Sequence, residues 1–279
     1  MRRAYHANRK QICTSNGCHG SGGIPRSLKN TPWSVSQNFI RNPRTIQRII
    51  QTARLTPTDL VLEVGAGDGA LTQELARHCR TVVAYEIDPH LVDKLRRRLR
   101  QEPTVRCVAG DFLAARPPRE PFTVVGNIPY AITSRIIDWC LRAPHLQAAT
   151  LVTQWEYARK RTGDYGRWSR VTILSWPIFS WRLVGRISRY HFRPIPAVDS
   201  GILHLERRET PLVADLVEYQ AMVKLGFSGM GGSLYASLRR RYPGRRLAAG
   251  FWKAGVDPAT PVGLVTPQQW VILAEEMTS

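Results

Sequence analysis

The chain has 279 residues, of which 43% are hydrophobic and 9% aromatic. This composition is typical of a globular protein with a substantial core, and it excludes an intrinsically disordered chain. No apolar run has the length of a membrane span and no segment resembles a signal peptide, so we expect a cytoplasmic protein with no membrane contact. Five scattered cysteines fit a reducing compartment better than a disulfide framework.

The net charge is the strongest global feature. Lys and Arg outnumber Asp and Glu by 40 to 21, which gives a net charge of +19 and an isoelectric point near 10.6. Such a chain is expected to bind a polyanion, either a nucleic acid or an anionic membrane surface. Aromatic residues lie among the basic clusters, and no segment combines basic residues with a clean apolar stripe. A nucleic acid is therefore the favoured partner.

Residues 1–30 contain six Lys or Arg and no Asp or Glu, and they show no apolar period. We predict a disordered basic arm that contacts RNA backbone. Cys13, Cys18 and His19 are candidate zinc ligands within it, but three candidates at an unfamiliar spacing make a weak zinc signal. No metal site is therefore predicted.

The next elements have the order of a nucleotide-binding fold. Asn42 and Pro43 are typical of a helix N-cap and first turn, and the apolar residues within 46–53 have helical spacing. Residues 60–62 then read as a buried strand, and residues 63–69 form a glycine-rich turn that leads into an amphipathic helix. A strand, a glycine turn and a helix in this order are typical of the ligand crevice in a doubly wound sheet.

Two further predicted strands end in acidic residues. Glu86 follows the strand at residues 81–85 and lies 21 residues beyond Gly65, close to the ~20 expected of an acid that binds ribose hydroxyls. Asp111 follows the strand at residues 105–108, where it can accept a hydrogen bond from an adenine amine. Acids at these strand ends are more often functional than structural.

A fourth strand, predicted at residues 122–125, leads into the sequence Gly-Asn-Ile-Pro-Tyr at residues 126–130. Taken alone, these residue types are more typical of a turn. At the end of a strand, however, the Asn127 side-chain oxygen and a backbone carbonyl held by Pro129 can both accept hydrogen bonds from an exocyclic amine. Tyr130 can lie flat against a planar ring that has left its stack.

The glycine turn and its downstream acid also fit a nicotinamide or flavin dinucleotide, so they do not identify the cofactor by themselves. No lysine follows the glycines as it does in a phosphate-binding loop, which argues against an NTPase. The amine-binding residues decide between nicotinamide and S-adenosylmethionine, because a hydride-transfer enzyme has no use for them. We therefore expect a methyltransferase that uses S-adenosylmethionine.

The chain resembles the Erm family of rRNA adenine N6-methyltransferases over roughly residues 33–207. The motifs that carry the resemblance occur in the family's order at residues 36–40, 63–72, 86–88, 110–112, 126–130 and 191–200. This order is far more specific than any single motif. The resemblance implies an α/β fold with a Rossmann-like methyltransferase domain at residues 31–207. A small helical domain that binds RNA would follow at residues 208–279, with RNA in the cleft between the two.

The resemblance also implies a donor site for S-adenosylmethionine. The residues assigned to it are Gln37, Asn38, Ile40, Gly65, Gly67, Glu86, Ile87, Asp111, Phe112 and Asn127. Residues 37–40 would close over the methionine end, and the two glycines would lie beneath it. Glu86 would hold the ribose. Asp111 would bind the adenine amine, with Ile87 and Phe112 alongside the ring.

Catalysis is assigned by the same resemblance to Asn127, Tyr130 and Phe192. Asn127 would contact both the donor and the target, and Phe192 would lie near Tyr130 and help to hold the target base. For an Erm enzyme that target is an adenine in the peptidyl-transferase region of 23S rRNA. Its methylation confers resistance to macrolide, lincosamide and streptogramin B antibiotics. We expect a monomer whose partner is large-subunit rRNA.

Two alternatives stay open. The small-subunit rRNA adenine dimethyltransferases share this layout and a very similar amine-binding motif, but Ser36 and Ile128 favour the Erm family. The other alternative is a non-catalytic RNA-binding protein on the same fold. A protein that only binds RNA would not need the two strand-end acids and the amine-binding residues together.

The remaining chain is expected to supply binding surface. The last strands are predicted at residues 179–187 and 202–205. Apolar spacing predicts C-terminal helices at residues 212–227, 234–242 and 268–277. The Arg-rich segment at residues 239–246 is expected to contact rRNA backbone.

Overall fold

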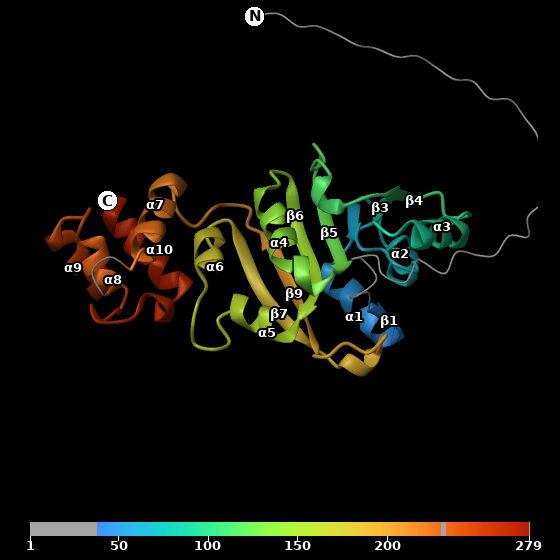
Figure 1. The fold of residues 1–279 in the computed structure, drawn as a ribbon. Coiled ribbons are helices and arrows are strands. Elements are labelled where there is room, and N and C mark those ends of the chain that lie inside the picture. Colours follow the sequence, from blue (N-terminus) through green and yellow to red (C-terminus); the bar gives the residue numbers. More distant parts are fainter. Residues whose placement is uncertain (1–37, 230–232, 279) are drawn as a thin grey trace, which may run out of the picture. The chain divides into compact units, whose positions relative to one another are not determined.

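A computed structural model describes residues 38–229 and 233–278 of the chain, which belong to one compact unit (Figure 1). The expectations for residues 1–30 and for Gln37 fall outside these ranges. The unit is built on a seven-stranded sheet with the strand order β4-β3-β2-β5-β6-β9-β7. The predicted α/β, Rossmann-like sheet is confirmed.

Five strands run parallel and two complete the sheet antiparallel to their neighbours. The parallel strands are β2 (Leu60–Val64), β3 (Thr81–Glu86), β4 (Val105–Ala109), β5 (Phe122–Asn127) and β6 (Leu146–Gln154). The others are β9 (Ser200–Arg207) and β7 (Phe179–Ile187), with β9 lying between β6 and β7. A separate two-stranded ribbon pairs β1 (Phe39–Ile40) with β8 (Phe192–Arg193).

Helices connect the strands, and capping side chains mark the start of three of them. The connecting helices are α1 (Pro43–Ala53), α2 (Ala70–Leu75), α3 (Pro89–Arg98), α4 (Thr133–Arg142), α5 (Trp155–Arg161) and α6 (Arg170–Ser175). The predicted cap of α1 is confirmed, because the Asn42 side chain accepts a 3.2 Å hydrogen bond from the Thr45 N–H. Asp88 caps α3 by accepting a 2.9 Å bond from the His90 N–H.

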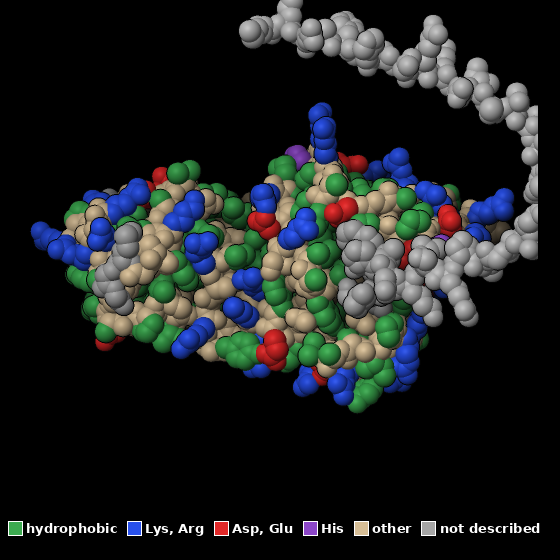
Figure 2. Space-filling view, in the orientation of Figure 1, with side chains coloured by type: hydrophobic (Ala, Val, Ile, Leu, Met, Phe, Trp, Pro, Cys, Tyr) green, Lys and Arg blue, Asp and Glu red, His purple; other side chains and the backbone are tan. Residues whose placement is uncertain are grey.

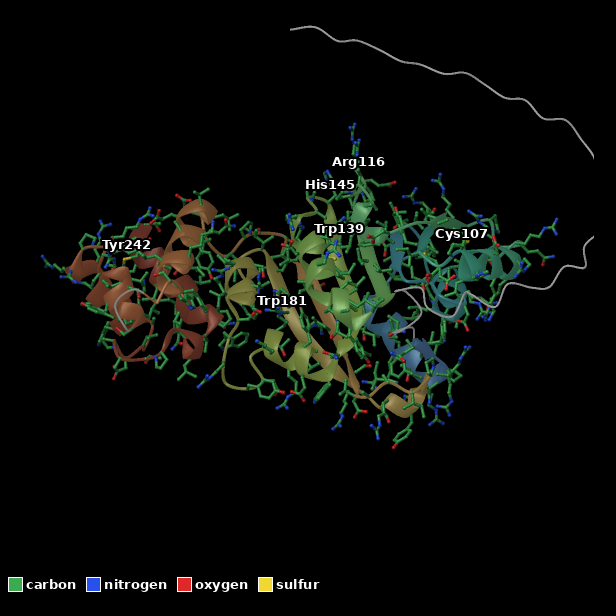
Figure 3. The ribbon with its side chains drawn as sticks, viewed as in Figure 1. Cys107, Arg116, Trp139, His145, Trp181 and Tyr242 are labelled. Atoms are coloured by element: carbon green, nitrogen blue, oxygen red, sulfur yellow. The ribbon has the colours of Figure 1, made fainter. Side chains whose placement is uncertain are left out.

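Apolar clusters cover both faces of the sheet. Along β2, Leu60, Leu62 and Val64 belong to one cluster and Val61 to another, as strand alternation requires. Trp139 packs from α4 onto Phe122 of β5, with ring centroids 6.0 Å apart (Figure 3). Buried layers on both faces fix the register of the strands, and therefore the position of the residues at their ends.

The C-terminal region consists of helices with their own apolar cluster. They are α7 (Leu216–Gly226), α8 (Leu234–Leu238), α9 (Gly244–Lys253) and α10 (Pro267–Thr278). Helix α7 begins four residues later than predicted because Asp215 caps it, its side chain accepting a 2.9 Å bond from the Glu218 N–H. Tyr219 donates its hydroxyl to the Ile173 carbonyl at 2.9 Å and so ties α7 to α6. Over the described ranges, no helix is long and apolar enough to cross a membrane.

Candidate active site

The candidate site lies where the strand order reverses. Strand β2 has β3 on one side and β5 on the other. After β2 the chain adds β3 and β4 on one side of the sheet and then returns to add β5 and β6 on the other side. Ligands of doubly wound sheets bind at this point, beyond the carboxyl ends of the strands. The glycine turn follows β2, and the Gly-Asn-Ile-Pro-Tyr sequence begins within β5. The structure therefore brings the two predicted motifs together.

Two glycines allow this close approach. Gly126 pairs with Val64 across the two strands, and a Cβ at Gly126 would lie only 2.6 Å from the Val64 carbonyl oxygen. Gly65 adopts a φ of +71°, a backbone conformation that residues other than glycine rarely adopt. A Cβ at Gly65 would lie 3.6 Å from the Asn127 carbonyl oxygen, so the turn passes directly beside the predicted catalytic residue.

Asn127 is held in one orientation by the segment that precedes α1. Its side-chain Nδ2 donates a 2.6 Å hydrogen bond to the backbone carbonyl of Asn38. A carbonyl oxygen only accepts hydrogen bonds, so this contact places the nitrogen toward Asn38 and leaves Oδ1 as an acceptor. Both residues are half-buried. An amine donates hydrogen bonds, so Oδ1 is the atom of this side chain that can bind one.

The ribbon of β1 and β8 supports this contact. Phe39 pairs with Arg193 and Ile40 with Phe192, so residues far apart in the chain are fixed beside each other. Ile40 is 6% exposed and Phe192 is fully buried in the cluster that contains Ile49 and Ile202. The structure thus places Phe192 in the core behind the site, and its predicted contact with the target base stays a prediction.

Tyr130 is anchored through its hydroxyl group. The Tyr130 hydroxyl lies 2.7 Å from the Oγ of Ser200, which is fully buried at the start of β9. Burial raises the pKa of Tyr130, so its phenol is neutral at physiological pH. The ring itself is half-buried, and its hydroxyl end is fixed. Sequence reasoning missed the role of Ser200, although it lies in the motif at residues 191–200.

Glu86 joins the glycine turn to the end of β3. One carboxylate oxygen accepts a 2.8 Å hydrogen bond from the Gly67 N–H. The other accepts 2.9 Å bonds from the N–H groups of Ile87 and Asp88. The residue is 5% exposed, and these three donors orient its carboxylate. Ile87 itself is half-buried.

The end of β4 carries one exposed and one buried site candidate. Asp111 is exposed, and its side chain accepts a 2.9 Å bond from the Leu113 N–H, which caps a short 3₁₀ turn. Phe112 is only 4% exposed because its ring packs between Tyr85 and Trp139, at centroid distances of 5.3 and 4.5 Å. Asp111 is available to a ligand, while a contact of Phe112 with an adenine ring stays a prediction.

Two further acids lie close to the glycine turn, Glu63 at the end of β2 and Asp68 in the turn itself. Glu63 is 1% exposed, and its Oε2 has no hydrogen-bond partner within the described ranges. Burial raises the pKa of Glu63 to about 8. Asp68 is also buried and forms a 2.5 Å ion pair with Arg41, a contact that sequence reasoning missed.

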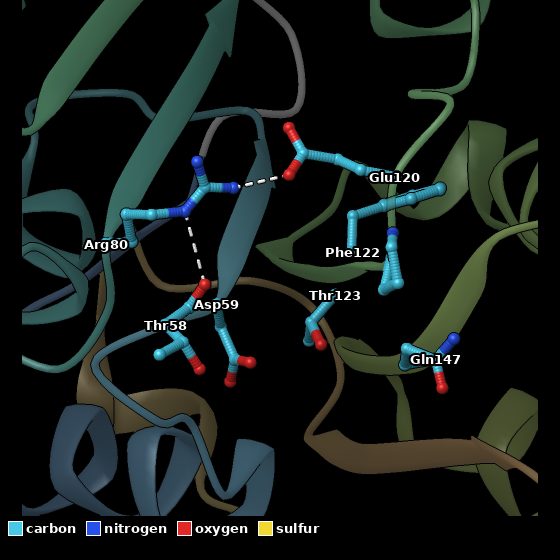
Figure 4. A pocket seen from close by; sticks show the side chains of 8 residues that line it. Thr58, Asp59, Arg80, Glu120, Phe122, Thr123 and Gln147 are labelled. Atoms are coloured by element: carbon cyan, nitrogen blue, oxygen red, sulfur yellow. Dashed lines mark hydrogen bonds and ion pairs between the residues drawn. The ribbon is translucent and has the colours of Figure 1, made fainter.

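A separate pocket lies at the other end of the strands, beside their amino ends (Figure 4). Its lining includes Thr58, Arg80 and Glu120, which precede β2, β3 and β5 rather than follow them. The Arg80 guanidinium is already engaged, by a 2.6 Å ion pair with Glu120 and a 3.2 Å hydrogen bond to the Thr58 carbonyl. This pocket contains none of the predicted site residues.

Known proteins resemble this chain over most of its length. The family model for "Ribosomal RNA adenine dimethylase" matches residues 29–279. An "rRNA methyltransferase" of Streptomyces thermotolerans is 54% identical over 243 residues, which cover 86% of this chain and 81% of that protein. An "rRNA adenine N-6-methyltransferase" of Streptomyces fradiae is 55% identical over 241 residues, or 85% and 76% of the two chains.

A solved structure extends the likeness to three dimensions. The crystal structure of the "23S rRNA methyltransferase ErmE" matches with a TM-score of 0.85 at 51% sequence identity. The match covers 87% of this chain and all of that chain. Sequence and fold therefore agree on the same group of proteins.

Proposed function

Because this chain belongs to the ribosomal RNA adenine dimethylase family, as an Erm-type rRNA adenine N6-methyltransferase, we propose that it methylates N6 of an adenine in 23S rRNA. The methyl donor in this proposal is S-adenosylmethionine. The observation that carries the proposal is the orientation of Asn127 at the reversal point of the sheet. Its Oδ1 has no hydrogen-bond donor among the residues that the structure describes, and it can accept from an amine.

Asn127 and a backbone carbonyl together engage the target amine. The lone pair of an adenine N6 is delocalised into the ring, and two acceptors that draw its hydrogens favour a nitrogen with a localised lone pair. The Pro129 carbonyl already accepts a 3.1 Å bond from the Ile132 N–H. This favours the Ile128 carbonyl as the second acceptor beside Asn127 Oδ1.

Tyr130 positions the base. Its ring offers a face to an adenine taken out of its stack, and stacking offsets part of the few kcal/mol that unstacking costs. The hydroxyl bond to Ser200 holds the far end of the ring and so limits where the side chain can move. Because its phenol is neutral, Tyr130 is not a base, and the proton leaves N6 to solvent after transfer.

The residues around the glycine turn fit a nucleoside donor. Gly65 exposes backbone at the crevice, where a side chain would approach Asn127. The oriented carboxylate of Glu86 can accept from ribose hydroxyls, and exposed Asp111 can accept from an adenine amine. When bound, S-adenosylmethionine supplies a methyl group on a sulfonium, which is electrophilic enough that alignment is the main task of the protein.

The wider biological proposal follows from the substrate. Methylation of 23S rRNA would confer resistance to macrolide, lincosamide and streptogramin B antibiotics and would take place in the cytoplasm. The enzyme would act as a monomer, with the helical region at residues 208–279 as additional RNA-binding surface. Basic side chains spread over the face seen in Figure 2 suit a polyanionic substrate.

The test uses tritiated S-adenosylmethionine with protein-free large-subunit and small-subunit rRNA as separate substrates. Label on N6 of an adenine in large-subunit RNA is the expected result. Label confined to small-subunit RNA would reassign the protein to the small-subunit dimethyltransferases. Failure to label either RNA, with donor binding demonstrated by calorimetry, would refute the proposed reaction.

A further inference from the structure

One tryptophan of α9 is almost fully exposed to solvent. Trp252 of α9 is 85% exposed, whereas Leu247 and Phe251 of the same helix are buried. Of the tryptophans within the described ranges, it alone is exposed. A buried Trp contributes strongly to folding through its large apolar area, so an indole left in water gives up that contribution. Its position suits binding better than folding.

The helix residues that neighbour Trp252 on the same face are also exposed. Arg245, Ala248, Ala249 and Trp252 have helical spacing, and all four are exposed. They share the outer face of α9, while the buried residues face α10 and the C-terminal core. The two alanines carry no long side chain that would cover the indole. A planar group can therefore reach the ring.

The same segment is strongly basic. Residues 239–253 contain six Lys or Arg and no Asp or Glu. Arg241 pairs with Glu218 at 2.5 Å, and Lys253 lies 3.6 Å from Glu276. Within the described ranges, Arg240 and Arg245 have no acidic partner. Figure 2 shows several Lys and Arg side chains along the upper part of the C-terminal helical region.

Another aromatic cluster of this protein provides a contrast. The Arg159 guanidinium lies 4.0 Å from the Tyr165 ring centroid and 5.9 Å from that of Trp155, so these rings are already covered by a cation. In the part of the chain that the structure describes, no guanidinium stacks on Trp252. Within the described ranges, the Trp252 ring therefore has no cation stacked on it, although Arg245 lies on the same helix face.

We infer that the outer face of α9 binds a single-stranded segment of RNA, with Trp252 stacked on an unpaired base and Arg245 contacting the backbone. A cationic surface with one aromatic platform matches single-stranded nucleic acid. A membrane would require a wider apolar stripe than one indole between alanines. This inference rests on the proposed function and adds a contact outside the methyl-transfer site.

The experiment measures binding of a large-subunit rRNA transcript by filter retention at several salt concentrations, together with steady-state methylation. The variants are Trp252→Ala, Trp252→Phe and Arg245→Ala. Val217→Ala is the matched control, because Val217 of α7 is 80% exposed and lies outside the basic segment. Trp252→Ala should raise the RNA Kd and KM about fivefold to a hundredfold, with kcat unchanged at saturating RNA.

The variants distinguish stacking from charge. Trp252→Phe should retain part of the affinity, and Trp252→Ala should keep the salt dependence of the wild type. Arg245→Ala should reduce the slope of log K against log salt by roughly 0.7. An RNA Kd for Trp252→Ala within about twofold of wild type, in an enzyme that still methylates the transcript, would overturn the inference but not the proposed function. If wild type neither binds nor methylates the transcript, the proposed function fails and this inference with it.

Discussion

The side-chain nitrogen of Asn127 donates a 2.6 Å hydrogen bond to the backbone carbonyl of Asn38, which lies 89 residues earlier in the chain. The bond couples the segment before α1 to the end of β5. It fixes which end of the Asn127 amide faces the crevice, because the carbonyl can only accept. The acceptor Oδ1 is thereby oriented before any substrate binds, which is the arrangement that catalysis by positioning requires.

This relationship predicts the effect of Asn127→Asp. A carboxylate keeps the acceptor for the target amine, but its second oxygen would face the Asn38 carbonyl without a proton between them. We expect methyl transfer to fall by about a hundredfold or more, measured as initial rates with tritiated donor. Asn42→Asp is the matched control, since aspartate caps a helix as well as asparagine does. Wild-type rates for Asn127→Asp would show that the bond to Asn38 is not needed.

A second prediction concerns the contact of β2 with β5. A methyl group at Gly126 would lie 2.6 Å from the Val64 carbonyl oxygen, so Gly126→Ala must push the two strands apart. Overpacking of this kind costs about 1–3 kcal/mol, and it displaces Asn127 as well. We expect a lower melting temperature and lower activity together. Gly263→Ala is the control, because a Cβ there meets nothing within 4 Å.

The hydroxyl pair of Tyr130 and Ser200 predicts a coupling energy. Tyr130→Phe and Ser200→Ala each remove the same 2.7 Å hydrogen bond, so the double variant should lose little more activity than either single one. The expected coupling is about 0.5–1.5 kcal/mol in kcat/KM. Additive losses would contradict a positioning role for Ser200. Tyr130→Ala, which also removes the stacking face, should lose considerably more activity than Tyr130→Phe.

Burial of Glu63 predicts a pH dependence of stability. Its pKa is about 8 in the folded protein against an ordinary 4.5, so between these values the folded state binds more protons than the unfolded state. The contribution of Glu63 is therefore fully present below pH 4.5 and is lost as pH rises through 8. Glu63→Gln keeps a neutral side chain at every pH, and its stability relative to wild type should increase between pH 5 and 8.

Urea unfolding at pH 5, 6.5 and 8 measures this difference. Burial lowers the pKa of His204 to about 4 from an ordinary 6.5. His204 therefore reduces the stability of the folded state as pH falls from 6.5 toward 4. Because His204 is present in both proteins, its contribution cancels in the comparison. Glu209→Gln, which removes an exposed carboxyl, serves as control. A difference between Glu63→Gln and wild type that does not change with pH would contradict a protonated Glu63.

Local patterns were sufficient to predict the class of the sheet and most of its strands. The strand ends at Gly65, Glu86, Asp111 and Asn127 follow apolar runs in a fixed order, and parallel strands bring their carboxyl ends to one edge. Sequence reasoning did not predict β6 or α9. Strand β6 ends at Gln154 and α5 begins at the next residue, so no turn separates the two elements. Helix α9 has no side-chain cap to mark its start.

The long-range contacts of the site were not predictable from local patterns. Ser200 lies 70 residues from Tyr130, and only the antiparallel insertion of β9 beside β6 brings them together. The burial of Phe112 and Phe192 also depends on tertiary packing, which a strand-end motif does not record. For the same reason the orphaned carboxylate oxygen of Glu63 emerges only from the structure.

The most direct measurement compares wild type with Asn127→Ala for donor binding, by calorimetry, and for methyl transfer to large-subunit rRNA. If Asn127 engages the target amine, transfer should fall by at least about a hundredfold. Donor affinity should decrease far less, because the glycine turn and the carboxylate of Glu86 are unchanged. Methyl transfer by Asn127→Ala at a rate near that of the wild type would contradict the assignment of this residue to the reaction.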